Sequence, residues 1–425
     1  METIGGELAH AVVPGSRVGP FKLGMSLFEA LSVLKLLAPV SAETRKTQLY
    51  FSRTTPLDKP IVLNVCALGM KLRFDAKYQK LLVIDINDVA TFPMSFQGHL
   101  VGGKQNSASE SGTLKQLYEI LGVTHTGFRK DELPKDNFCL QYPGLLVAFR
   151  VPLKENFTGI PLVLNGGISP PLVRVVVHEF DFARNVAKQI TRSTAILDVY
   201  VNDDRPVEVY FREKGGIIAI GDSTCQDVIS LLGPPSKLHV KQLEPIGTKA
   251  RRQAQDPSGG VNDDYFLNYF ELGLDILMNG TSNTVRKMIL RTNLLAHPAF
   301  GQYEKSCFTI KFAERLQQGS SSSKRSGANQ HVVYGTKISK KTSAPSFEDL
   351  LTTSVSKPLV TDKTVLVSCD EHWHNIAKKL DILDEKPMVN EKADQPFGPC
   401  FLFGYRHSVF EVDKASLQIA SLTLF

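Results

Sequence analysis

A recurring order of one helix and three strands restricts the fold of this 425-residue chain more than any other feature of its sequence. The clearest instance begins at 219, with AIGDSTCQDVISLLGPPSK. Asp222 or Ser223 can cap a helix there, with Gln226 placed for a capping box. An apolar stripe at i, i+3, i+4 and i+7 from Cys225 indicates the helix, which must end at Gly233 because two prolines follow.

Three short apolar segments follow this helix and predict an antiparallel meander. The aromatic run 265–270 favours a strand, and the alternating run 274–278 follows a Leu-Gly pair that can make a tight turn. An Asn-Gly dipeptide is a strong turn signal before a third strand at 285–290. In the middle strand the alternate apolar residues should face a core, whereas Asp275 should point to solvent.

The same order is found in three further segments, two in the first half of the chain and one at its end. In each segment a glycine precedes an alternating strand, and alternate residues then form one apolar face that a helix can cover. The four glycines are Gly69, Gly144, Gly273 and Gly404. The residues expected to face the core, at matched offsets, are Met70, Leu72, Phe74; Leu145, Val147, Phe149; Leu274, Ile276, Met278; and Tyr405, His407, Val409.

The sequence therefore predicts an α+β fold, in which degenerate repeats of one helix plus a three-stranded antiparallel meander pack as two or more sheet-containing lobes. The fourth copy should begin with a helix at 346–353. The expected divisions are an N-terminal tail at 1–20, a first lobe at 21–160 with two units, a second lobe at 161–312 with a β-rich connector and the third unit, an insert at 313–346, and a C-terminal unit at 347–425.

Composition and charge exclude several classes of protein. Apolar residues at 42% and charged residues at 22% are ordinary globular values, which exclude collagen, wholesale disorder and a coiled coil. The excess of 49 basic over 43 acidic residues is too mild to indicate a nucleic-acid partner. The first residues lack the basic and apolar segments of a secretory signal, and the six cysteines occur singly, so we expect a cytoplasmic protein with reduced thiols.

Two segments concentrate much of the basic surplus. The loop 241–260 and the serine- and lysine-rich insert 313–346 contain too few apolar residues to offset the entropy of ordering, so both are expected to be disordered. Within the first of them, Lys249, Arg251 and Arg252 are the candidate contacts for a partner or for an acidic membrane. The simpler alternative is a solvated loop with no partner.

The sequence contains no recognisable catalytic constellation. It has no phosphate-binding glycine motif, no H-E-x-x-H and no G-x-S-x-G. The nearest metal-like run is Cys369 to His374, which lacks a second pair of ligands and is better explained as a polar linker with a packed Trp373. Acidic pairs at 203–204 and 263–264 lie at expected turns, where aspartate is favoured for backbone reasons. We therefore expect no catalytic residue, no metal site and no cofactor.

Two stretches of the third unit are distinctive, namely GDSTCQDVISLLGPPSK and VNDDYFLNYFELGLDILM. Together they resemble the eukaryotic phagosome (phagophore) assembly factor 1 family, whose second motif reads N-D-Y-F-x-N-Y-F-x-L-G-x-D-I-L-F. Here Thr224 is inserted in the first motif and Met278 replaces the family's aromatic residue. The matching residues interpreted as the structural family motif are Gly221, Asp222, Gly233, Asp264, Tyr265, Asn268, Tyr269 and Gly273.

The resemblance implies a non-enzymatic, cytoplasmic regulator of autophagy that acts as an adaptor or scaffold subunit. It also implies direct pairing with a WD40-propeller protein of the breast-carcinoma-amplified type. The pair would be recruited to the phagophore, the pre-autophagosomal structure, where the propeller reads phosphoinositides. The basic loops and aromatic strands leave a direct phosphoinositide-binding or lipid-transfer module as the alternative, and an enzyme would need a pocket with convergent polar groups.

Overall fold

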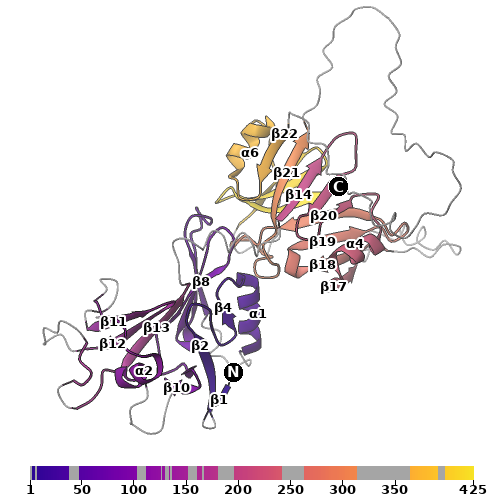
Figure 1. Ribbon diagram of the computed structural model, residues 1–425. Coiled ribbons are helices and arrows are strands. Elements are labelled where there is room, and N and C mark those ends of the chain that lie inside the picture. Colours follow the sequence, from indigo (N-terminus) through magenta and orange to yellow (C-terminus); the bar gives the residue numbers. More distant parts are fainter. Residues whose placement is uncertain are drawn as a thin grey trace, which may run out of the picture.

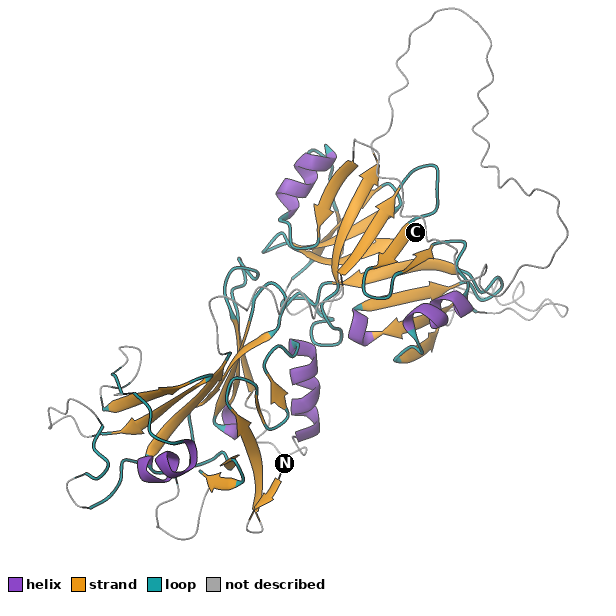
Figure 2. Cartoon of the chain, in the orientation of Figure 1, coloured by secondary structure: helices purple, strands orange, loops and turns teal. Residues whose placement is uncertain are grey.

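The chain forms two β-rich lobes with a small number of helices, a mixed α+β architecture (Figure 1). The computed structural model describes residues 2–4, 7–37, 47–102, 112–125, 127–129, 134, 136–151, 160–164, 167–179, 196–241, 263–313, 364–390 and 398–425. We call the described residues up to 179 the first lobe and those from 196 the second lobe. Figure 2 shows that strands make up most of both lobes and that the helices lie against them.

The first lobe is built on a seven-stranded antiparallel sheet. In spatial order its strands are β11 (Asn137–Tyr142), β12 (Leu145–Arg150), β13 (Leu172–His178), β8 (Leu81–Ile86), β7 (Met70–Phe74), β6 (Ile61–Val65) and β5 (Thr47–Tyr50). The helices of this lobe are α1 (Leu27–Leu37), α2 (Leu114–Leu121) and the short 3₁₀ turn η2 (Cys66–Leu68). Because β13 pairs with β8, the expected boundary at residue 160 passes through this sheet.

A smaller, six-stranded arrangement completes the first lobe. It contains β1 (Glu2–Ile4), β2 (Glu7–Val13), β3 (Arg17–Val18), β4 (Phe21–Lys22), β9 (Met94–Phe96) and β10 (His99–Val101). The segment 1–20, expected as a tail, therefore contributes strands, and β2 pairs in parallel with β9. Val12, Val18 and Phe21 join the core of this lobe.

The second lobe contains an eight-stranded antiparallel sheet. In spatial order its strands are β17 (Lys237–Val240), β18 (Tyr265–Tyr269), β19 (Leu274–Met278), β20 (Val285–Arg291), β26 (Ile419–Leu424), β25 (Ser408–Asp413), β24 (Cys400–Tyr405) and β23 (Met388–Asn390). The last strand of the chain, β26, thus lies near the middle of the sheet, between β20 and β25. Helix α4 (Cys225–Leu232) precedes one half of the sheet, and η3 (Phe270–Leu272) separates β18 from β19.

A five-stranded sheet packs with the eight-stranded one in the second lobe. Its order is β16 (Gly216–Ala219), β15 (Glu208–Phe211), β14 (Ile196–Val201), β21 (Cys307–Ala313) and β22 (Thr364–Ser368). Strands β14 and β21 are parallel, as β2 and β9 are in the first lobe. Helix α6 (Trp373–Leu380) contacts β22 and buries Trp373, Ile376, Ala377 and Leu380.

The predicted core faces are correct in three of the four segments. All nine residues of the sets after Gly69, Gly144 and Gly273 are completely buried. The fourth set is wrong, because Tyr405 and Val409 are half-buried and His407 is exposed. There the left-handed backbone of the turn falls on Arg406, at φ +49°, rather than on Gly404, so the buried residues of the next strand begin at Ser408.

Two local details of the expected third unit are corrected by the structure. The helix cap is Thr224, with its hydroxyl accepting from the backbone N–H of Asp227 and the Asp227 carboxylate accepting from the Thr224 N–H. Thr224 therefore caps the helix in place of Asp222 or Ser223, and the partner in the capping box is Asp227 and not Gln226. Asp275 does not point to solvent but is 2% exposed.

The described helix of the C-terminal unit is α6, which begins at Trp373, within the run Cys369 to His374. The interpretation of that run as a polar linker is therefore wrong at its end, where the helix starts. Trp373 is packed as expected, with its ring stacked on Phe403 at a centroid distance of 4.2 Å. His372 caps the helix by accepting from the backbone N–H of His374. The helix expected at 346–353, the insert 313–346 apart from Ala313, and the loop 241–260 apart from Lys241 lie outside the described residues.

The two lobes meet through reciprocal polar and apolar contacts. The Gln79 amide donates to the Asn293 carbonyl at 3.0 Å, and the Asn293 amide donates back to Gln79 Oε1 at 2.8 Å. Lys80 pairs with Glu304 at 3.0 Å. Leu295 of the second lobe belongs to the core of the first lobe, so the segment after β20 joins the two lobes.

Candidate functional site

The predicted contact residues Lys249, Arg251 and Arg252 lie outside the described residues. The structural motif residues, in contrast, are all described and surround α4 and the β18–β20 meander. The hydroxyl of Tyr269 donates to the Gly233 carbonyl at 3.0 Å and so ties the end of α4 to the sheet. Tyr265 donates to Asn283 at 3.0 Å and Asp264 accepts from Arg286 at 2.6 Å.

The remaining motif residues shape backbone turns or hold a buried carboxylate. Gly221, at φ +92°, donates its N–H to the Val285 carbonyl, whereas Asp222 is exposed. Gly273 adopts φ +65°, and an added Cβ there would lie 2.4 Å from the Glu304 carbonyl oxygen. Asn268 donates to Asp275 at 2.6 Å.

Asp275 is the centre of a buried hydrogen-bonded network on the outer face of the eight-stranded sheet. Tyr303 donates to its Oδ1 atom at 2.8 Å, and Arg291 donates to its Oδ2 atom at 3.2 Å and 3.0 Å. Burial, and then the adjacent Asp275 carboxylate, raise the pKa of Tyr303 above its usual range. The segment 292–306 therefore covers this part of the sheet.

A pocket of about 480 Å³ opens beside this network, over the outer face of β20, β23, β24, β25 and β26. Its polar wall includes Arg291, His297 and Glu411, whereas Ile289, Leu402 and Val409 form an apolar floor. His297 comes from the segment that joins the lobes. The pocket thus lies where the inter-lobe segment meets the sheet.

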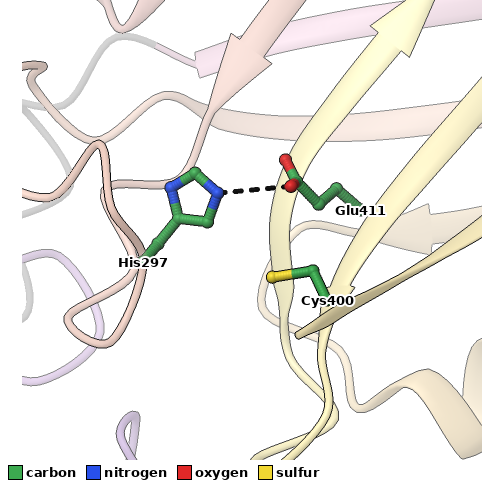
Figure 3. Close-up of side chains that lie close together, drawn as sticks. All are labelled: His297, Cys400 and Glu411. Carbon is green, nitrogen blue, oxygen red and sulfur yellow. Dashed lines mark ion pairs between the residues drawn. The ribbon is translucent and has the colours of Figure 1, made fainter. Parts of the chain in front are cut away.

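His297, Cys400 and Glu411 point toward one another at one side of this pocket (Figure 3). The Nε2 atom of His297 lies 3.4 Å from Glu411 Oε1. Ser421 donates to Glu411 Oε2 at 2.7 Å, and the backbone N–H of Ala299 donates to His297 Nδ1 at 3.2 Å. Since Nδ1 accepts, a neutral imidazole carries its proton on Nε2, facing the carboxylate.

The protonation states of this group follow from burial and charge. Burial alone raises the pKa of Glu411, but hydrogen bonds from His297 and Ser421 and the charge of Arg291 outweigh it and lower that pKa to about 2. Burial, together with the carboxylates of Glu411 and Asp413, raises the pKa of the Cys400 thiol to about 12. At neutral pH the carboxylate is therefore ionised and the thiol is protonated, so Cys400 is not an activated nucleophile.

A second hollow, of about 710 Å³, lies between the lobes and is lined by helix α1. Eight of the eleven residues of α1, LFEALSVLKLL, are apolar, yet only Leu27 and Ala30 are buried. Leu36 is 87% exposed. Glu213 and Glu271 of the second lobe stand on the opposite wall. We call Phe28, Val33 and Leu36 the α1 face. Val33 also packs against the core of the first lobe, and Glu29 and Ser32 of the same helix line the hollow beside this face.

Sequence reasoning missed both the α1 face and the His297–Cys400–Glu411 cluster. The α1 face carried a signal, since its apolar residues exceed what one buried stripe requires. The cluster carried none, because its members come from the inter-lobe segment, β24 and β25 and show no recognisable spacing. Among the described helices, none is both long and apolar enough to cross a membrane.

Comparison with known proteins gives consistent matches along almost the entire chain. A family model described as phagosome assembly factor 1 matches residues 17–425. A PHAF1 protein of Arabidopsis thaliana is 27% identical, over 97% of this chain and 92% of its own length. A PHAF1 protein of Drosophila melanogaster is 25% identical, over 99% and 93% of the two chains.

A PHAF1 protein of Caenorhabditis elegans is 24% identical, over 68% of this chain and 74% of its own length. No solved structure matches the chain. The family match includes both lobes, together with the α4 turns and the Asp275 network described above. The chain therefore belongs to the phagosome assembly factor 1 family.

Proposed function

We propose that the protein is a non-enzymatic regulator of autophagy that acts as an adaptor or scaffold subunit. In this proposal it pairs directly with a WD40-propeller protein of the breast-carcinoma-amplified type and is recruited from the cytoplasm to the phagophore. The observation that carries the proposal is the family match over residues 17–425. The ionised, hydrogen-bonded Glu411 beside the pocket is compatible with a binding role for it.

The α1 face supplies a surface on which such a partner could dock. Helix α4 of the second lobe, CQDVISLL, also lies against a sheet, but its exposed residues are polar apart from Ile229, and it buries Val228 and Leu232. Helix α1 instead presents Phe28, Val33 and Leu36 to the hollow between the lobes. Exposed apolar patches rimmed by polar residues are typical of protein interaction sites.

The adaptor proposal is tested by affinity capture of the full chain from cells, with and without starvation. We expect a propeller protein to be recovered near one-to-one. Leu36→Asp should reduce that recovery at least about tenfold, since a carboxylate in an apolar contact costs more than 1.4 kcal/mol. Its thermal unfolding should stay within about 0.5 kcal/mol of the parent, because the residue is 87% exposed.

The matched control is Val123→Asp, at a residue that is 81% exposed. Val123 is distant from α1 in the sequence and is not among the residues that line the hollow. It should leave the recovery unchanged. Equal recovery with Leu36→Asp and Val123→Asp would remove the α1 face from the proposal. Failure to recover any propeller protein with the parent chain would remove the adaptor function itself.

The second candidate function is a direct phosphoinositide-binding or lipid-transfer module, which is favoured by the basic residues Lys249, Arg251 and Arg252. Each basic residue near an anionic surface contributes about 1 kcal/mol. If lipid contact is direct, reversing all three to glutamate should abolish recruitment in cells and sedimentation with phosphoinositide vesicles. Under the adaptor proposal, recruitment survives this change, and vesicle binding by the purified chain is weak until the partner is added.

The proposal extends to the architecture, whose helix-and-meander units we infer to be degenerate copies of one another. Matching turns support this for the first and third units. Gly69 and Gly273 both have left-handed backbones and each donates its N–H three residues back, to Cys66 and Phe270. In both units the residue before the helix forms an isolated antiparallel β-bridge with the residue just before the last strand of the meander. The bridged pairs are Ser26 with Lys80, before β8, and Thr224 with Thr284, before β20.

A further inference from the structure

Three side chains with different donor atoms converge beside the pocket on the outer face of the eight-stranded sheet (Figure 3). One ligand atom each from His297, Cys400 and Glu411 lies within 4.8 Å of the others. They come from the inter-lobe segment, from the start of β24 and from β25. We propose that this cluster binds a divalent transition-metal ion, with Zn²⁺ as the best fit.

The donor set selects the class of ion. Imidazole nitrogen, thiolate sulfur and carboxylate oxygen are all common zinc ligands, whereas Ca²⁺ and Mg²⁺ are bound by oxygen alone. Tetrahedral zinc bonds of about 2.0–2.3 Å place ligand atoms roughly 3.3–3.8 Å apart. The cluster must therefore contract by about 1 Å, which small rotations of the three side chains can supply.

The geometry leaves one coordination position open. Three protein ligands are typical of zinc sites whose fourth ligand is water or a bound molecule. Here the cluster borders the pocket, which is wide enough to admit either one. We therefore expect an accessible site whose fourth ligand exchanges with solvent.

Neighbouring residues already orient the carboxylate as a ligand. Ser421 donates to Glu411 Oε2 at 2.7 Å, and the Asn390 amide donates to Glu411 Oε1 at 3.4 Å. Such hydrogen bonds to ligating groups commonly set metal affinity by tens-fold. Asp413, which pairs with Arg53 of the first lobe at 3.5 Å, adds a further negative charge near Cys400.

Metal binding has a defined proton balance and a structural consequence. The ion replaces the thiol proton of Cys400, which leaves to solvent, and the Nε2 proton of His297. The ring proton then resides on Nδ1, so the Ala299 N–H that donates to Nδ1 at 3.2 Å must turn away. Because Leu295 and Asn293 of the same segment contact the first lobe, an ion would fasten the inter-lobe segment to the sheet.

The proposal is tested on the full chain after treatment with a chelator. Titration with Zn²⁺ against a chromophoric chelator should show one tight equivalent. Cys400→Ser and His297→Gln should each weaken it by about 100-fold or more, since both remove a ligand. The control is Cys66→Ser, an exposed cysteine of the first lobe, which should bind as the parent does.

A second measurement guards against variants that fail to fold. Loading the parent chain with Co²⁺ should give the near-ultraviolet charge-transfer band of a cobalt–thiolate bond, and the Cys66→Ser chain should keep it. Absence of that band in the parent, or zinc affinity that is equal in the parent and in a folded Cys400→Ser chain, would overturn the proposal. The cluster would then be a half-buried His297–Glu411 contact that serves the fold alone.

Discussion

Asp275→Ala is expected to lower the free energy of unfolding by about 3–5 kcal/mol, the usual cost of removing one partner from a buried ion pair. The Asp275 side chain is 4% exposed and Arg291 is 22% exposed, so the guanidinium would lose its carboxylate without gaining full solvation. Tyr303 and Asn268 would also lose their acceptor. Denaturant unfolding followed by circular dichroism measures the change.

A solvent-screened ion pair provides the matched control. Lys379 and Glu371 approach to 2.7 Å, but the lysine side chain is 45% exposed. Glu371→Ala should therefore cost less than about 1 kcal/mol. Asp275→Asn, which keeps an acceptor and loses the charge, should fall between the two. Equal unfolding midpoints for Asp275→Ala and Glu371→Ala would show that the buried network does not stabilise this lobe.

Gly273→Val should lower the free energy of unfolding by about 2–5 kcal/mol, for two separate reasons. A left-handed backbone costs a side-chain-bearing residue about 1–2 kcal/mol. Gly273 has φ +65°, and its added Cβ would also lie 2.4 Å from the Glu304 carbonyl oxygen and 2.8 Å from the Ser306 nitrogen. Those are backbone atoms, so the segment that covers the sheet must shift, at about 1–3 kcal/mol.

Gly215→Val separates the two causes. Gly215 has nearly the same φ, +69°, but no heavy atom lies within 4 Å of the position of its added Cβ. It should carry the backbone cost alone, about 1–2 kcal/mol. Thermal melting of the two variants beside the parent chain measures the difference. If both melt together, close contact between the segment 304–306 and the Gly273 turn contributes nothing to stability.

The alternation of apolar and polar residues predicted which face of a strand is buried where the core covers that face. The alternating strands after Gly69, Gly144 and Gly273 were found because each has one face buried in a core. In the fourth segment the same glycine rule failed, since Arg406 adopts the left-handed backbone two residues later. A turn of that type is not specified by glycine spacing alone.

Asp275 shows why alternation could not predict the outer face of the sheet. A polar residue opposite an apolar set was expected to face water, but the segment 292–306 covers that face and supplies Tyr303 as a donor. This contact depends on tertiary packing, which a local sequence pattern does not contain.

The buried face of helix α6, in contrast, is visible in the local sequence. Its buried residues lie at helical spacing, namely Trp373, Ile376, Ala377 and Leu380.

The candidate site likewise has one part that a local pattern could reveal and one part that it could not. The eleven residues of α1 include more apolar residues than one buried stripe of a surface helix requires, and this excess can be seen in the sequence. His297, Cys400 and Glu411 are brought together only when the inter-lobe segment reaches the sheet. Single histidines, cysteines and glutamates at such separations carry no spacing rule that predicts a shared ion.

The place of β26 in the eight-stranded sheet has a consequence for how the protein is made. This strand pairs with β20 on one side and with β25 on the other, so it joins the two halves of the sheet. It also follows every other described strand in the sequence, and is therefore synthesised after them. Domains generally fold from the N-terminal end during synthesis. The first lobe can therefore mature early, whereas the second lobe completes its large sheet only once β26 has been made, and a variant truncated before Ile419 lacks a central strand.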